Sequence, residues 1–332
     1  MNNLKKLGLT ALAGSLASVS AYAAEMTVSG ATMLTFTDED SSEVTGNPYG
    51  MKTNLGFTAS GEVNGYTVSY MQTSVDQFAG MSSARLSVDM GDMGLIAFDQ
   101  GSGSGLATID DKTPTAAEEI WDGLDGLTAG GLVGAAGNSG VWNYIHSFAG
   151  IKFNGAIRKG SGTKNADGAS SGATDQAGQG AWDFALTTDG SMLGVDGLAI
   201  GAGYGEAARD GTSIGDDDHT TVFANYSVGP ATFGAQWSSI QYGTTGTADQ
   251  NTEAWGVAFN VNDNLSISYG ERDLEYDGAG STATVTEKGD GVAVAYTMGS
   301  IKIAGNRNSV SNNGGTTGSS DEMTEIAVSF AF

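Results

Sequence analysis

The residues best placed to act on ions are carboxylates gathered in one stretch, Gly101 to Gly140. Connections longer than roughly 12–15 residues are usually functional or disordered. Acids beside a narrow, low-dielectric passage attract cations and repel anions. Against one cation, Lys112, the stretch carries Asp110, Asp111, Glu118, Glu119, Asp122 and Asp125. By themselves these acids suit a passage for ions and a solvated surface segment equally well.

The same stretch carries the clearest helix signal of the chain. Pro114 suits the first turn of a helix, and Thr115 and Glu118 have the spacing of a capping box. Gly123 is suited to end such a helix. We therefore expect a short helix between Thr113 and Gly123.

Catalytic residues are scarce, and we expect no enzyme. Gly211 to Gly215 fits the G-x-S-x-G pattern around Ser213, but a nucleophile elbow needs a strand, a turn and a helix, and this pattern lies in a polar loop. The two histidines are His146 and His219, and there is no cysteine. A hydrolase that uses Ser213 or His219 is the weaker reading.

No cofactor is expected, and calcium is the one ion that the acidic loops could hold. Asp38 to Glu43 and Asp216 to Asp218 offer carboxylate oxygens, which calcium prefers. Solvated acidic loops explain both runs more simply. Without cysteine and with few histidines, a transition-metal cluster is not expected.

The net charge of the chain and its N-terminal sequence limit the classes of protein to which it can belong. The net charge of −24 argues against a nucleic-acid partner, whose phosphates need Lys and Arg. Lys5 and Lys6, the apolar run Leu7 to Val19 and the A-x-A site Ala21 to Ala23 are typical of a secretory signal peptide. We expect residues 1–23 to be removed and residues 24–332 to form the mature protein.

A period of two runs through most of the mature chain. Met26 to Thr37 and Tyr49 to Ser60 are examples in which apolar residues alternate with polar ones, as half-buried strands do. We count sixteen such strands, joined alternately by short turns and long polar loops. This rhythm predicts an up-and-down antiparallel barrel.

A large β-sandwich is the alternative fold. The face opposite the apolar one consists of Gly, Ser, Thr, Asn and scattered charges, which suits a wet lumen better than a second core. Closing the sheet also removes its edges. Aromatic residues near strand ends fit girdles at two membrane interfaces, namely Tyr66, Trp237, Tyr269, Phe330 and Phe332.

The whole mature chain resembles the general bacterial porins, most closely those of alphaproteobacteria. After the signal peptide and its first strand, the order of motifs is similar to the family's, with a turn into the fifth strand, a long third loop, an aromatic-glycine turn and a terminal aromatic strand. Those motifs are Gly91 to Leu95, Gly101 to Gly140, Ser147 to Ile151 and Val328 to Phe332.

The resemblance implies a 16-stranded outer-membrane channel that forms a homotrimer. It also implies that the third loop folds inward and that its acids face basic residues of the opposite wall, here Lys52 and Arg85. The terminal Phe332 would be read by the barrel-assembly machinery. The implied surroundings are outer-membrane lipid and lipopolysaccharide, with small hydrophilic solutes passing through.

Together these observations favour a general diffusion porin with weak cation selectivity. A substrate-selective channel on the same barrel is one alternative. A structural or adhesive barrel without a channel is the other, and it is supported only by the long Gly/Ser/Thr-rich loops.

Overall fold

A computed structural model describes residues 25–39, 46–75, 82–124, 130–137, 139–159, 180–209, 215–278 and 283–332. The expected signal peptide, residues 1–23, lies outside these ranges. The first eight strands are β1 (Glu25–Glu39), β2 (Tyr49–Val63), β3 (Tyr66–Val75), β4 (Ser83–Asp89), β5 (Leu95–Gln100), β6 (Ser139–Phe148), β7 (Ile151–Lys159) and β8 (Gly180–Asp189). The second eight are β9 (Leu198–Ala207), β10 (Asp217–Val228), β11 (Ala231–Gln241), β12 (Asp249–Asn260), β13 (Leu265–Asp277), β14 (Val285–Met298), β15 (Ile301–Ser311) and β16 (Ser320–Ala331).

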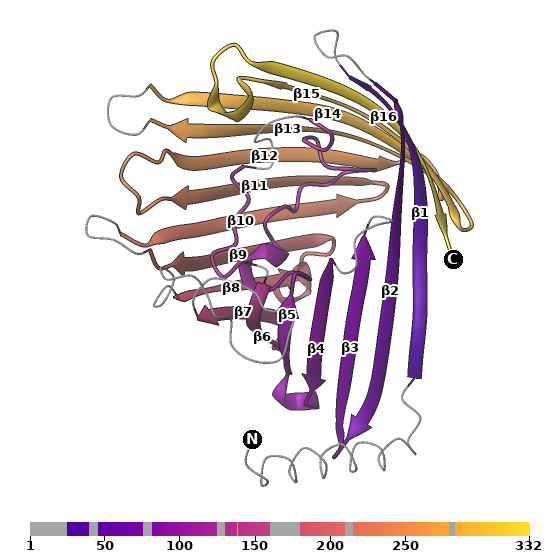
Figure 1. The fold of residues 1–332 in the computed structure, drawn as a ribbon, viewed down its shortest axis with the longest axis vertical. Coiled ribbons are helices and arrows are strands. Elements are labelled where there is room, and N and C mark those ends of the chain that lie inside the picture. Colours follow the sequence, from indigo (N-terminus) through magenta and orange to yellow (C-terminus); the bar gives the residue numbers. More distant parts are fainter. Residues whose placement is uncertain are drawn as a thin grey trace, which may run out of the picture.

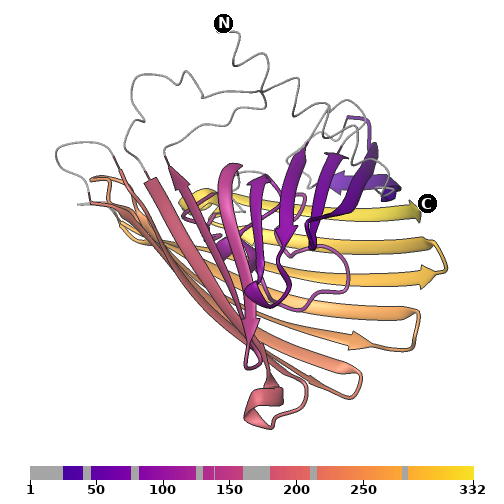
Figure 2. The ribbon, with the colours of Figure 1, turned by 90° about the horizontal axis from the view of Figure 1, so that it is seen from below.

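The sixteen strands form one closed antiparallel barrel in which each strand pairs with its neighbours in sequence. The barrel closes between β1 and β16, where Ala31 lies opposite Ala331 and Glu39 opposite Met323. Figures 1 and 2 show this single continuous wall. The sequence-based prediction of a 16-stranded barrel is confirmed, and the sandwich alternative is wrong.

The two faces of the wall differ as the alternation predicts. Apolar side chains of one face are exposed, among them Val28 at 63% and Ile326 at 51%. On the other face polar side chains are buried, including Asp183 and Asn308 at 2%. A barrel whose outer face is apolar and whose inner face is polar suits a bilayer outside and water inside.

Tight turns close one end of the barrel. Between β2 and β3, Asn64 and Gly65 both have positive φ, 52° and 85°. A two-residue hairpin turn with positive φ at both positions matches the twist of its strands and favours an Asn-Gly pair. The described residues contain no helix long and apolar enough to span a membrane.

Short 3-10 turns are the helical elements of the described residues. They are η1 (Gly91–Met93), η2 (Gly105–Thr108), η3 (Gly190–Leu193) and η4 (Asn313–Gly315). The second of these opens the β5–β6 loop, residues 101–138. Figure 1 shows this loop in magenta, passing across the strands of the wall.

Candidate functional site

The β5–β6 loop starts from a set of buried polar contacts. Asp99, which is fully buried, accepts hydrogen bonds from Ser102 N at 2.9 Å and Ser104 Oγ at 2.6 Å. Arg85 donates to Gly103 O at 3.3 Å and to the side chain of Asn143. Arg85 therefore holds the base of the loop.

Asp183 of β8 binds two parts of the loop. We call residues 101–124, which follow β5, the outgoing limb, and residues 130–137, which lead to β6, the returning limb. One carboxylate oxygen accepts a hydrogen bond from Leu106 N at 2.9 Å and the other from Ala136 N at 2.7 Å. Leu106, Ile109 and Val133 are buried beside this clamp with Ala185, Phe223 and Ile240. A carboxylate that accepts backbone N–H groups from both limbs fixes where the loop leaves the wall and where it returns.

Four glycines form a row under the outgoing limb. Gly234, Gly256, Gly270 and Gly291 are register neighbours on β11 to β14, and we call them the glycine row. A Cβ at Gly256 would lie 2.8 Å from Pro114 O, and one at Gly291 would lie 3.1 Å from Ile120 Cβ. The loop backbone packs against these strands because no side chain intervenes.

Side chains of the wall bind the loop backbone along the same path. Lys112 N donates to Gln236 Oε1 at 2.6 Å, and Ala116 N donates to Ser268 Oγ at 2.9 Å. Asn308 Nδ2 donates to Glu119 O at 3.2 Å and to Asp122 O at 2.9 Å. The outgoing limb thus runs from β11 to β15 on the polar face.

The helix expected between Thr113 and Gly123 is absent, and that prediction is wrong. Bends and turns occupy 116–123 instead. Thr115 Oγ1 donates to Glu118 O at 2.7 Å, so its hydroxyl is used within the turn. Ser268 accepts from Ala116 N and Asn308 donates to Glu119 O, so the wall binds both ends of this non-helical segment. Tertiary contacts have overridden the local signal.

The returning limb passes back along the wall, from β13 and β12 towards β10. Gly131 N donates to Gln250 Oε1 at 2.8 Å, and Gly134 N donates to His219 Nδ1 at 3.3 Å. Arg272 of β13 donates to Gly130 O, and its guanidinium lies 4.8 Å from the ring centroid of Trp121. Arg272 therefore contacts both limbs.

The predicted acids of the loop fall into two groups. Asp110 and Asp111 lie beside Lys112, where burial raises the pKa of Asp110 to about 6 and also raises the pKa of Asp111. Glu118, Glu119 and Asp122 lie at the far end of the outgoing limb; burial and neighbouring acids raise the pKa of Glu118 and of Asp122. Asp125 lies outside the described residues.

The predicted basic wall is arranged differently from the expectation. Lys52 lies within electrostatic range of Glu118 and Asp122, and its role in a constriction stays a prediction. Arg85 is instead bound to the base of the loop. Two wall residues near these acids, Lys302 and Glu325, were not predicted as site residues. The alternation of polar and apolar residues indicated that both side chains point inward. The path of the loop, which brings its acids close to them, could not be predicted from the sequence.

Two residues considered for catalysis or calcium binding, His219 and Asp217, have structural partners. Ser213 lies outside the described residues, and His219 accepts a hydrogen bond from the loop. Asp217 is paired with Arg209 and accepts from Gly243 N at 3.0 Å. Within the described ranges, no group of three or more His, Cys, Asp or Glu is arranged to hold a metal ion.

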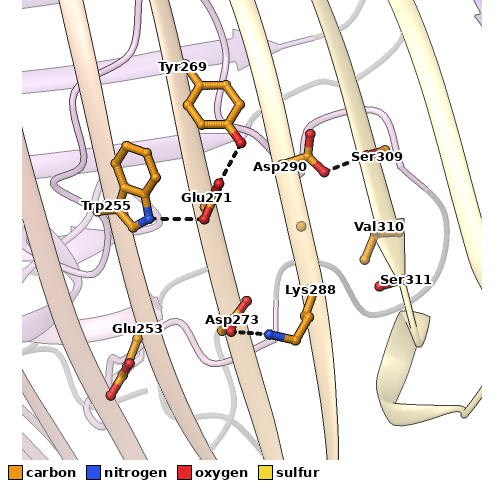
Figure 3. A pocket seen from close by; sticks show the side chains of 11 residues that line it. Glu253, Trp255, Tyr269, Glu271, Asp273, Lys288, Asp290, Ser309, Val310 and Ser311 are labelled. Atoms are coloured by element: carbon orange, nitrogen blue, oxygen red, sulfur yellow. Dashed lines mark hydrogen bonds and ion pairs between the residues drawn. The ribbon is translucent and has the colours of Figure 1, made fainter.

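A groove of about 570 Å³, lined mainly by charged and polar side chains, lies on the outer side of β12 to β15. Trp255 Nε1 donates to Glu271 at 3.2 Å, Tyr269 OH donates to Glu271 at 2.6 Å, and Lys288 binds Asp273 at 2.6 Å (Figure 3). Rings with an apolar body and a satisfied polar tip are typical of membrane interfaces. This groove belongs to the outer surface and not to the loop site.

Comparisons with known proteins agree with this architecture. The family profile described as Gram-negative porin matches residues 8–287. No curated protein sequence matches the chain. Similar solved structures include OmpT of Vibrio cholerae (TM-score 0.66, 13% identity), OmpF of Salmonella typhi in complex with daunomycin (0.64, 13%) and a mutant porin of Rh. blastica (0.57, 14%). They cover 93% of this chain and 98%, 98% and 100% of their own.

Proposed function

Because this chain belongs to the family of Gram-negative porins, we propose that its β5–β6 loop is the constriction of an outer-membrane diffusion channel. The family and the closed barrel make the protein a water-filled channel through which ions and small hydrophilic solutes diffuse passively. Passage of this kind needs no covalent chemistry, so we propose that the protein is not an enzyme.

One observation carries the proposal for the loop. Its backbone is bound by polar-face side chains of the wall, from Arg85 on β4 to Asn308 on β15. Those side chains belong to the face opposite the exposed apolar residues. We infer that the loop folds into the barrel and narrows the lumen.

The charges at the loop support weak cation selectivity. Carboxylates beside a narrow passage raise the local concentration of cations and lower that of anions. In a planar bilayer that separates two KCl concentrations, we expect a reversal potential showing that potassium passes more readily than chloride. A reversal potential that favours chloride would contradict the proposal, and the absence of any conductance would favour a structural barrel.

Cation preference should fall as the solution becomes more acidic. A carboxyl group carries charge above its pKa and is neutral below it, and the pKa of Asp110 is raised to about 6. We therefore expect the potassium preference to decline between about pH 8 and pH 5, with a midpoint near 6. Reversal potentials measured along this range provide the check.

Two substitutions make the pH experiment specific. In Asp110→Asn the part of the titration centred near 6 should disappear. Asp92→Asn removes a carboxylate from the η1 turn, outside the loop, and should leave the titration as it is. If both variants titrate like the parent protein, Asp110 does not contribute to the field in the pore.

We also propose a homotrimer that lies among outer-membrane lipid and lipopolysaccharide. The exposed apolar outer face gives such a subunit surface to bury, and the family resemblance supplies the number of subunits. Native mass measurement of the detergent-solubilised protein tests it.

Sequencing the N-terminus of the exported protein tests the proposed removal of residues 1–23, for which a new terminus at Ala24 is expected.

Phe332 is expected to matter for assembly. Its N–H donates to Gly30 O at 2.9 Å and its carbonyl accepts from Gly30 N at 3.0 Å, so the last residue continues the closure of the barrel. The side chain is 71% exposed and thus available to the assembly machinery that we propose reads it. We expect Phe332→Ala to lower the yield of assembled barrel several-fold, while Phe148→Ala, another exposed aromatic at a short turn, lowers it less.

A further inference from the structure

A carboxylate of the wall, that of Glu325, lies close to the far end of the β5–β6 loop. Glu325 is an inward residue of β16, two positions from Met323, against which Gly123 of the loop packs. Asn308, the register partner of Met323, binds Glu119 O and Asp122 O. Glu325 therefore lies next to the point at which the outgoing limb is fastened.

The side chain of Glu325 is oriented at the seam where the barrel closes. Thr37 of β1 is its register partner, and Thr37 Oγ1 donates to Glu325 Oε2 at 3.4 Å. Beyond the loop the wall continues into β1 and β2, because β1 pairs with β16 and β2 with β1. Glu325 thus stands between the loop acids and the β2 side of the lumen, which carries Lys52.

Electrostatic interactions join residues of four elements at this place. Glu325 interacts with Asp122, Glu118 and Lys52. Glu118 in turn interacts with Glu119, Lys302 and Lys52. The group therefore holds four carboxylates and two lysines. Its excess is two negative charges, and Glu325 accounts for half of that excess.

We propose that Glu325 is a selectivity-determining residue of the pore, acting with Glu118 and Asp122 of the loop to attract cations at the β1–β16 seam. This inference rests on the proposed function and deepens it. The acids of the passage then come from both the loop and the wall, and the two lysines moderate their field.

The test compares two glutamates of the same strand. Glu322 lies on β16 with the opposite parity and pairs with Arg307 on the outer face. A unit charge at several ångströms changes ion concentrations by a factor of roughly two to five in high dielectric. We expect Glu325→Gln to lower the potassium-to-chloride permeability ratio by about this factor in about 0.1 M KCl, and Glu322→Gln to leave it unchanged.

Salt and a compensating variant separate an electrostatic role from a structural one. The Debye length falls from about 10 Å at 0.1 M to about 3 Å at 1 M salt, so the single-channel conductance of Glu325→Gln should match that of the parent protein at the higher concentration. Lys302→Gln should raise the permeability ratio, and the double variant Glu325→Gln with Lys302→Gln should return it towards the parent value.

Three results would overturn this assignment. Equal permeability ratios for Glu325→Gln and Glu322→Gln would remove Glu325 from the pore. A conductance change that persists at about 1 M salt would make it a positioning residue of the loop. If the permeability ratio of the double variant is no closer to the parent value than that of Glu325→Gln, Lys302 does not offset the charge of Glu325. If the parent protein itself fails to prefer potassium, the proposed function fails instead.

Discussion

Replacing Asp183 with alanine should produce a wider and noisier channel. Asp183 accepts one hydrogen bond from each limb of the β5–β6 loop, from Leu106 N and Ala136 N. Leaving a buried N–H unpaired costs about 1–3 kcal/mol, and two such groups together cost about 2–6 kcal/mol. Since about 1.4 kcal/mol is a tenfold change in population, the clamped position should no longer dominate.

Single-channel recording checks this expectation. Asp183→Ala should show a higher mean conductance and frequent stepwise fluctuations. Asp189→Ala is the matched control, because Asp189 ends the same strand and binds Ser191 of a short turn instead of the loop. A quiet Asp183→Ala channel with the parent conductance would show that the clamp does not hold the loop.

Placing a side chain in the glycine row should lower the conductance, whereas Asp183→Ala should raise it. A Cβ at Gly256 already lies 2.8 Å from Pro114 O, so a leucine there cannot be accommodated without moving the outgoing limb away from the wall. Overpacking of this kind costs about 1–3 kcal/mol. Because the loop would be pushed towards the lumen, we expect Gly256→Leu to reduce the single-channel conductance.

Gly305 of β15 offers the control for this substitution. A Cβ there meets only Glu325 O at 3.5 Å and Val294 Cγ1 at 3.7 Å, and the residue shares the outward face with Ile303. Gly305→Leu should assemble and conduct like the parent protein. The argument fails if the two leucine variants conduct alike, or if Gly256→Leu conducts better.

The barrel could be predicted from the sequence because each strand carries its own signal. Side chains alternate between faces with a period of two, so runs such as Tyr49 to Ser60 identify a strand and both of its faces without reference to any neighbour. The spacing of short turns and long loops then gives the order of the strands. All sixteen expected strands are present.

The site could be predicted only in part, because its contacts join residues far apart in the sequence. The long acidic loop was identified, and the expectation that its acids face Lys52 and Arg85 across a pore stays a prediction. The glycine row was hidden, since Gly256 and Gly291 become neighbours of the loop only through strand register. The helix at Thr113 was predicted from local propensity, but bends and turns in contact with wall side chains stand there instead.

A disulfide between the loop and the wall tests the central claim most directly. The chain has no cysteine, and a Cβ at Gly291 would lie 3.1 Å from Ile120 Cβ. Disulfides join Cβ atoms about 3.5–4.5 Å apart, so the two Cβ atoms must separate slightly and the Asn308 side chain, whose Oδ1 would overlap the new Cβ, must turn aside. If the loop lies inside the barrel, Ile120→Cys with Gly291→Cys should cross-link on oxidation, and Ile120→Cys with the outward Gly305→Cys should not. Free thiols at 120 and 291 in a folded, conducting barrel would contradict the account.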